Sequence, residues 1–257
     1  MRAFEGPPIE LQQLHYAVDG KTILGGVDLT VSRSEIVGIM GRSGTGKTTL
    51  LRLVMGLVSP TGGRILIFGQ DIAGLNEDRL DRVRVDMGMV FQGAALFDSM
   101  SVGENAAFGL VEHRRLPRKE MAGRVRELLE MVDMGGSEEL TPAQLSGGMR
   151  KRVGIARALA MEPSIMLYDE PTAGLDPISA AAIDALIVRL CEQVGMATLI
   201  VSHDVPSLRR VADRAALLHN GTFSATGRMS ELEASTDPAV RQFMTGSPEG
   251  PMTGEAG

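Results

Sequence analysis

A glycine-rich loop that ends in lysine restricts the fold of this chain more than any other feature. The sequence GRSGTGKT occupies residues 41–48, between the apolar run EIVGIM and the helix-like run KTTLLRLVMGLV. Glycines let the backbone turn tightly, so that successive N–H groups converge on phosphate oxygens. The N-terminus of the following helix adds partial positive charge. With a strand before it and a helix after it, this motif predicts a nucleotide triphosphate site.

Two side chains of this loop and two from a later strand supply the rest of a phosphate site. Lys47 can reach the terminal phosphates, and the Thr48 hydroxyl can bind Mg²⁺. The stretch IMLYDEP (165–171) carries Asp169 to the polar end of an apolar strand, where its carboxylate can hold Mg²⁺ through water. Glu170 follows directly and is placed to accept a proton from an attacking water.

A second possible anion site is more unusual. LSGGMR (145–150) opens the helical run KRVGIARALA, and a Ser-Gly-Gly turn at a helix N-terminus is suited to hold a phosphate. The loop at 41–48 already forms a phosphate site, so this second turn raises the question of whose phosphate it binds.

Composition excludes several classes of protein. The chain has 257 residues, 44% hydrophobic and 23% charged, with a net charge of −6, which argues against a protein built mainly to grip nucleic acid. The N-terminus lacks the plan of a signal peptide, and no apolar stretch approaches the roughly 20 residues that span a bilayer. Cys191 is the one cysteine, so we expect a buried structural thiol in a reducing cytoplasm.

Apolar runs alternate with helical patterns along the chain. The predicted elements are strands at 9–16, 22–31, 36–40, 64–69, 87–92, 165–169, 198–202 and 215–219, and a helix at 47–58. The pattern predicts an α/β fold: a P-loop NTPase core with a mainly parallel sheet and antiparallel strands, interrupted by an inserted α-helical subdomain. Its parts are the first half of the core (1–93), the helical subdomain (94–162), the second half of the core (163–236) and a tail (237–257).

Helix caps and turns add detail to this plan. Ser101 with Glu104, and Thr141 with Gln144, have the spacing of capping boxes. Asp176-Pro177 predicts a helix start, and Asn220-Gly221 suits a hairpin turn. The last dozen residues hold little that can pack, so we expect the tail to be flexible or to contact a partner.

Other nucleotide-binding classes fit less well. A GTPase would be expected to show an Asn-Lys-x-Asp guanine reader, which does not occur, and a small-molecule kinase has no use for LSGG. GRSGTGKT, Gln92, LSGGM, IMLYDEP, AGLD (173–176) and VSHD (201–204) stand in the order found in ATP-binding cassette (ABC) ATPases, and the chain resembles that family over residues 9–235.

The resemblance implies a use for the second anion site. In this family two ATPase subunits lie head to tail with ATP and Mg²⁺ between them, and the Ser-Gly-Gly turn of one copy faces the nucleotide of the other. The implied nucleotide contacts are Gly41, Arg42, Ser43, Gly44, Thr45, Gly46, Lys47, Thr48 and Thr49 of one copy, and Ser146, Gly147, Gly148 and Asp176 of its partner. The implied metal contacts are Thr48, Gln92 and Asp169.

The resemblance also implies catalytic roles and shows two departures. Gln92 is expected to sense Mg²⁺ and water, Glu170 to act as base, and His203 to contact the γ-phosphate. Met149 stands where most of the family has Gln. The usual adenine-stacking aromatic falls at Val18, which leaves Tyr16, two residues earlier, as an alternative.

The segment FQGAALFDSMSVGENAAF (91–108), the LSGGM turn and the ending DPAVRQFMTGSPEGP resemble the ATPase subunits of MCE-type (Mla-type) lipid transporters. That resemblance implies phospholipid or another lipid as cargo, and a cytoplasmic subunit held peripherally at the inner face of the inner membrane. The implied partners are a second copy, an integral-membrane permease reached through the groove beside Gln92 and residues 97–100, an MCE-type lipid-binding subunit and a small cytoplasmic regulatory subunit, without nucleic acid. An ABC ATPase for another cargo, a non-transport ABC clamp and a scaffold without turnover remain as alternatives.

Overall fold

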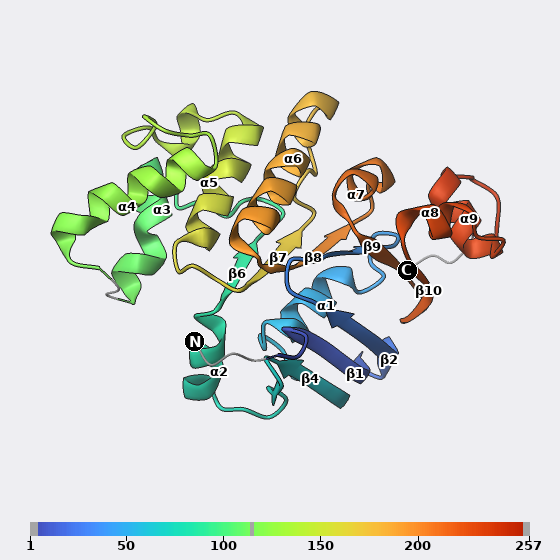
Figure 1. Ribbon diagram of the computed structural model, residues 1–257. Helices are drawn as coiled ribbons and strands as arrows, with labels where there is room; N and C mark the ends of the chain where they lie inside the picture. The colour runs from blue at the N-terminus through green and yellow to red at the C-terminus, as the bar shows by residue number, and fades with distance from the viewer. Residues whose placement is uncertain (1–4, 114–115, 254–257) are drawn as a thin grey trace.

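The computed structural model describes residues 5–113 and 116–253, and its centre is a six-stranded sheet (Figure 1). The strand order is β10-β9-β3-β8-β7-β6. These strands are β3 (Ile36–Met40), β6 (Met87–Val90), β7 (Ile165–Asp169), β8 (Ala197–Ser202), β9 (Arg214–His219) and β10 (Thr222–Gly227). All neighbours pair in parallel except β10, which forms a hairpin with β9 through the predicted turn at Asn220 and Gly221.

Both faces of this sheet are covered, which explains why its strands are continuous apolar runs. Along β7, Met166 and Tyr168 face one hydrophobic cluster, whereas Ile165 and Leu167 face another. The first cluster lies under α5 (Gly147–Leu159), α6 (Pro177–Val194) and α7 (Val205–Val211). The second lies against α1 (Lys47–Val54) and the smaller sheet.

The smaller sheet is antiparallel, with strand order β2-β1-β4-β5. Its strands are β1 (Ile9–Val18), β2 (Lys21–Val31), β4 (Gly62–Ile67) and β5 (Gln70–Asp71). Helix α1 lies between the two sheets, so the glycine-rich loop before it is held from both sides (Figure 1). This mixed parallel and antiparallel arrangement confirms the predicted fold class.

The helical subdomain extends from one end of the core (Figure 1). It contains α3 (Val102–Glu112), α4 (Arg118–Met131), a 3₁₀ turn (Pro142–Gln144) and α5. The capping box at the start of α3 is confirmed, because Ser101 Oγ accepts from the Glu104 amide and the Glu104 carboxylate accepts from the Ser101 amide. At the 3₁₀ turn, Gln144 Oε1 accepts from the Thr141 amide at 2.8 Å.

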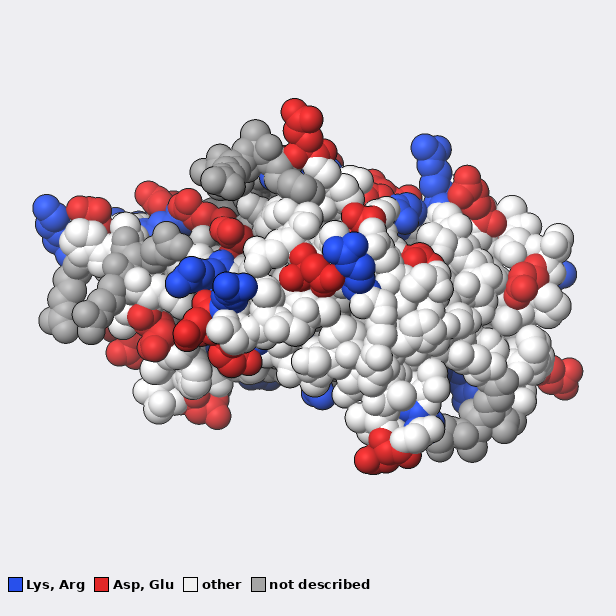
Figure 2. Space-filling model, turned by 90° about the horizontal axis from the view of Figure 1, so that it is seen from below, with Lys and Arg blue, Asp and Glu red and all other residues white. Residues whose placement is uncertain are grey.

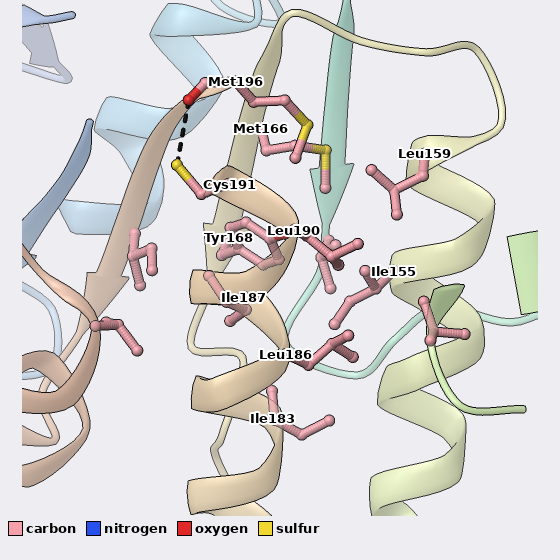
Figure 3. Packing of buried hydrophobic residues seen from close by; sticks show 14 of the residues in the cluster. Ile155, Leu159, Met166, Tyr168, Ile183, Leu186, Ile187, Leu190, Cys191 and Met196 are labelled. Atoms are coloured by element: carbon pink, nitrogen blue, oxygen red, sulfur yellow. Dashed lines mark hydrogen bonds between the residues drawn. The ribbon is translucent and has the colours of Figure 1, made fainter. Parts of the chain in front are cut away.

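Packing of α5 against β6 and α6 joins the helical subdomain to the core. Figure 3 shows Ile155 and Leu159 of α5 pointing toward Leu190 of α6, with Tyr168 of β7 beside them. Cys191 is buried in this cluster and its Sγ donates to the Met196 carbonyl at 3.3 Å, as expected for a structural thiol. Burial raises the pKa of this thiol, which keeps it protonated and unreactive.

Some expected element ends were wrong, and one helix was missed. The helix expected at 47–58 ends at Val54, because Gly56 takes a φ of +65° and packs against Leu80. That leucine belongs to α2 (Glu77–Arg84), a polar helix whose sparse apolar residues gave no periodic signal. Residues 87–92 are strand only to Val90, after which the chain turns.

The C-terminal segment contains two further helices, both of which end before the last dozen residues. After α8 (Met229–Glu233), residues Pro238–Thr245 form α9. The Met252 side chain is buried, and Arg42 of the glycine-rich loop donates to its carbonyl oxygen. Residues 254–257 of the predicted tail lie outside the described residues.

No helix within residues 5–113 and 116–253 combines the length and the apolar character that a membrane crossing requires.

Candidate functional site

The glycine-rich loop joins β3 to α1, as its sequence predicts. Gly46 takes a φ of +100° at the helix N-cap, a conformation that side chains rarely adopt. A Cβ atom there would lie only 2.8 Å from Cγ2 of Ile23. Glycine at this position therefore allows α1 to start against β2 with its N-terminus open to a ligand.

Lys47 is buried inside the loop that it follows. Its Nζ donates to the carbonyl oxygens of Gly41 at 2.8 Å and Arg42 at 2.9 Å, and lies 3.8 Å from Glu170 Oε1. Burial lowers the pKa of Lys47, while the carboxylates of Glu170 and Asp169 oppose that shift. An ammonium held this way is positioned to exchange loop carbonyls for phosphate oxygens when a nucleotide enters.

Thr48 and Asp169 meet across the gap between α1 and β7. The Thr48 hydroxyl lies 3.0 Å from Asp169 Oδ1, although the two residues are 121 positions apart. Burial raises the pKa of Asp169, and the Thr48 hydrogen bond and the charge on Lys47 offset part of that rise. A hydroxyl and a carboxylate this close form the hard oxygen donor set that suits Mg²⁺.

Glu170 has an unusual backbone and a well-held side chain. Its φ is +48°, in the left-handed region that a non-glycine residue occupies only under constraint. Its Oε2 accepts from Ser202 Oγ at 3.2 Å and from the His203 amide at 3.3 Å. The carboxylate is therefore fixed at the end of the sheet, where a base for an attacking water is needed.

His203 approaches the same carboxylate from the next strand. Its Nδ1 lies 2.9 Å from Glu170 Oε1, while more than half of the side chain stays exposed. One ring nitrogen is thus engaged by Glu170 and the ring is oriented, which leaves the other nitrogen available to a ligand.

Lys47, Thr48, Glu170 and His203 line one cavity of about 310 Å³, and Asp169 lies behind Thr48 outside this lining. Its lining residues are Ile23, Ser43, Gly44, Gly46, Lys47, Thr48, Thr49, Gln92, Glu170 and His203. Segments far apart in the sequence are therefore brought together around the predicted phosphate loop. Of the other predicted loop contacts, Thr45 Oγ1 donates to the Arg42 carbonyl at 2.9 Å, so it stabilises the loop itself.

The Ser-Gly-Gly turn lies elsewhere. Ser146 is exposed and caps α5 by accepting from the Met149 amide at 3.3 Å. The turn is adjacent to Leu175 and Ser179, which are the closest atoms that a Cβ on Gly147 or Gly148 would meet. None of its three residues belongs to the described lining of the 310 Å³ cavity.

The structure also places Asp176, the alternative adenine contact Tyr16, and Met149, where the sequence departs from the family pattern. Asp176 caps α6, accepting from the Ile178 and Ser179 amides at 3.0 Å each, and hydrogen bonds from Ser179 hold its pKa below the ordinary value. Tyr16 on β1 packs against the cluster beneath α1, and Met149 packs against the cluster beneath α5.

Two residues of this site were not predicted from the sequence. Ile23 lines the cavity next to the loop, and Ser202 donates to Glu170. Ile23 sits in an ordinary strand pattern and gave no signal. Ser202 lies within the VSHD motif, in which the family resemblance assigns a role only to His203.

The fold and this site define an ATP-hydrolysing P-loop cassette. The chain belongs to the ABC transporter family, whose model matches residues 24–173. The predicted family and its ATP hydrolase activity are thereby confirmed.

Several curated proteins are similar over most of the chain. It is 41% identical to the intermembrane phospholipid transport system ATP-binding protein MlaF of Escherichia coli (strain K12), over 95% of this chain and 91% of MlaF. It is 38% identical to protein TRIGALACTOSYLDIACYLGLYCEROL 3, chloroplastic, of Arabidopsis thaliana, over 95% of this chain and 75% of that protein. It is 42% identical to the methionine import protein MetN of Xanthomonas campestris pv. campestris (strain 8004), over 92% of this chain and 72% of MetN.

Solved ABC structures share the fold. The cassette MJ0796, in a dimeric post-hydrolysis state bound to ADP and Pi, matches with a TM-score of 0.78 and 32% identity, over 86% of this chain and 98% of that one. CbiO1 of Clostridium perfringens, part of the transporter complex cbiONQ, matches with a TM-score of 0.84 and 31% identity, over 95% of this chain and 97% of that one.

Proposed function

We propose that this chain is the ATPase subunit of a phospholipid transporter of the cell envelope, acting as a head-to-tail homodimer beneath a separate permease. One comparison carries the choice of cargo. The chain is 41% identical to the intermembrane phospholipid transport ATPase MlaF of both Escherichia coli and Haemophilus influenzae, over 95% of its residues. This match, together with the segment at 91–108 that resembles MCE-type ATPases, supports lipid rather than amino acid.

The homodimer is proposed because one chain offers two separate half-sites. The cavity at Lys47 has the loop, base and metal ligands, while Ser146 stands at a different exposed helix N-terminus. A head-to-tail pair brings Ser146, Gly147 and Gly148 of one copy, with Asp176, onto the nucleotide of the other. The dimeric state of the similar cassette MJ0796 supports this arrangement.

Within each composite site, the side chains have separate chemical roles. Lys47 and the loop amides bind phosphate oxygens, while Thr48, Asp169 and Gln92 would hold Mg²⁺, which neutralises phosphate charge when bound. Glu170 accepts the proton of the attacking water, since its carboxylate is oriented by Ser202 and His203. The second ring nitrogen of His203 faces the γ-phosphate. Ile23 supplies apolar contact beside the loop, and Tyr16 remains the proposed adenine contact.

A groove on the helical subdomain supports permease docking. It has a volume of about 1000 Å³, and its apolar lining includes Met100, Ala107, Phe108 and Val111. Glutamates stand along it, at positions 104, 112, 130, 138 and 139. Figure 2 shows charged side chains crowded at the end of the molecule that this subdomain forms, beside a wide uncharged region. Phe97 is exposed next to Met100 and contacts Phe108 with its ring tilted, the ring centroids being 4.7 Å apart.

This groove matches an amphipathic cytoplasmic helix of a membrane protein, with apolar residues inward and basic residues toward the glutamates. The chain would then sit peripherally on the cytoplasmic face of the inner membrane. An MCE-type lipid-binding subunit and a small regulatory subunit complete the proposed complex.

A transporter for another cargo is the second candidate, because the 42% identity to MetN shows that cassettes for amino acids are similarly close. Co-purification of the chain with its permease, followed by mass spectrometry of bound molecules, separates the two. Phospholipid together with an MCE subunit supports the proposal. A non-lipid solute with its own binding protein would replace it.

A further inference from the structure

Lys151 is a buried lysine on the helix that the Ser-Gly-Gly turn opens. It lies three residues after Gly148 and only 5% of its surface is exposed. Lysines are almost never buried this deeply unless their ammonium group is fully engaged. The partners of this ammonium group therefore indicate what the residue does.

The ammonium group bridges two loops of the proposed catalytic site. Its Nζ donates to the main-chain carbonyl oxygen of Gln92 and to that of Glu170, the latter at 3.2 Å. Burial lowers the pKa of Lys151, and the nearby charges of Asp169 and Glu170 oppose that shift. Because both acceptors are main-chain atoms, Lys151 fixes where these two residues stand and leaves their side chains free for the ligand.

The contact with Glu170 falls on a strained backbone. The φ of +48° at this residue needs external support. Its amide donates to the Val201 carbonyl at 2.9 Å on β8, and its carbonyl accepts from Lys151 on α5. The peptide units on both sides of the carboxylate are thus held by neighbouring elements.

A second cation of the same helix holds the Gln92 loop. Arg157 donates to the carbonyl oxygens of Ala94 at 2.8 Å and Ala95 at 2.6 Å. Both alanines have positive φ, so this loop also needs support. Helix α5 is itself packed against β6, and its Ile155 and Leu159 lie in one hydrophobic cluster with Leu190 of α6 (Figure 3). The turn that would receive the partner's nucleotide is therefore connected rigidly to both Gln92 and Glu170.

We propose that Lys151 is a positioning residue that couples the Ser-Gly-Gly turn to the catalytic base and to Gln92. Movement of α5 when Ser146 engages the partner's nucleotide is transmitted through the Lys151 ammonium to the two carbonyls. The inference rests on the proposed roles of Glu170, Gln92 and Ser146.

Three single variants test this role. Lys151→Met keeps the length of the side chain but removes the donor, and we expect kcat for ATP to fall about tenfold to a hundredfold while the Kd for ATP changes less than about twofold. Lys151→Gln keeps an N–H donor and should recover part of kcat. Arg152→Gln is the matched control: this neighbour pairs with Asp133 at 2.6 Å within the helical subdomain and should leave kcat unchanged.

Thermal unfolding of each variant separates positioning from folding. The proposal is overturned if Lys151→Met keeps kcat within about twofold of the parent value. It is also overturned if Lys151→Met and Lys151→Gln lower kcat equally and each loss of kcat is accompanied by a proportionate fall in Tm.

A double variant distinguishes this inference from the proposed function. If Lys151 acts by positioning Glu170, then Lys151→Met in a Glu170→Gln background should lower the residual turnover little further. Fully additive losses would show that Lys151 does not act through Glu170 and would overturn its proposed coupling to the base. If Glu170→Gln alone leaves turnover near the parent value, the assignment of the base fails instead, whatever Lys151 does.

Discussion

Nδ1 of His203 lies 2.9 Å from Oε1 of Glu170, which ties together two residues that follow different strands. The contact is a product of sheet register, because β7 and β8 are parallel neighbours and Asp169 pairs with Val201. Residues that follow such strands emerge at one edge of the sheet, where α/β proteins bind their ligands. The positions of the proposed base and of the histidine that contacts it are therefore set by the same strand pairing that builds the core.

Replacing the carboxylate tests the role of the base. We expect Glu170→Gln to lower the turnover of ATP by roughly 10²- to 10⁴-fold, since general-base catalysis contributes about that much. ATP affinity should persist and an ATP-bound dimer should accumulate, as phosphate release and size-exclusion chromatography with nucleotide would measure. Hydrolysis at the parent rate would place the base on another residue.

Lys47 should matter for binding rather than for folding. Its ammonium contacts only loop carbonyls and Glu170 among the described groups, so Lys47→Ala should weaken ATP binding at least about tenfold with little change in Tm. Titration calorimetry measures the affinity. Lys119→Ala removes an exposed lysine of α4 and serves as control. Equal affinities for Lys47→Ala and its parent would exclude the lysine from the nucleotide site.

Complementation tests the composite site. Lys47→Ala and Ser146→Arg homodimers should each be nearly inactive, because each lacks one wall in both sites. Equal mixing should restore roughly a quarter of parental ATPase activity, since half of the dimers are mixed and each has one complete site. The absence of any recovery in a mixture shown to exchange subunits would contradict the head-to-tail arrangement.

The groove on the helical subdomain gives a prediction about the permease. Val111 is 60% exposed and lines the groove, so Val111→Glu should abolish co-purification with the permease by adding charge to an apolar contact. ATPase activity of the isolated chain should not change. Val194→Glu alters an exposed valine at the end of α6, outside the groove, and should leave the complex intact. A complex that survives Val111→Glu would remove the groove from the interface.

Glu35 should make stability depend on acid pH. Burial tends to raise the pKa of Glu35, but the Arg214 guanidinium at 2.5 Å and the Ser32 amide hold it below the model-peptide value of 4.5. Because the folded pKa is depressed, this contribution to stability is complete above about pH 4.5 and is lost as pH falls through the folded pKa.

We therefore expect Glu35→Gln to lower the free energy of unfolding by about 1–3 kcal/mol at neutral pH, and by less at about pH 3. Urea denaturation at the two pH values measures the difference. A pH-independent loss would show that the charge of Glu35 contributes nothing.

The amino-acid sequence by itself determined the features that depend on neighbouring residues. The glycine-rich loop between strand and helix, the apolar strands at 36–40 and 165–169, and the cap at Ser101 each follow from spacing within a few positions. The family resemblance added Gln92 and His203, which the structure places with Lys47 around one cavity. The polar helix α2 and the packing of Met252 lacked such local signals and were missed.

Only the tertiary structure decided which distant groups meet. Lys151 reaches a carbonyl 59 residues away, Thr48 reaches Asp169 across 121 positions, and Ile23 forms a wall of the cavity from the other sheet. Such contacts arise because strand register and helix packing bring particular side chains to one edge. Periodicity reveals which face of an element is buried, but the partner that buries it is selected by the packing of the whole chain.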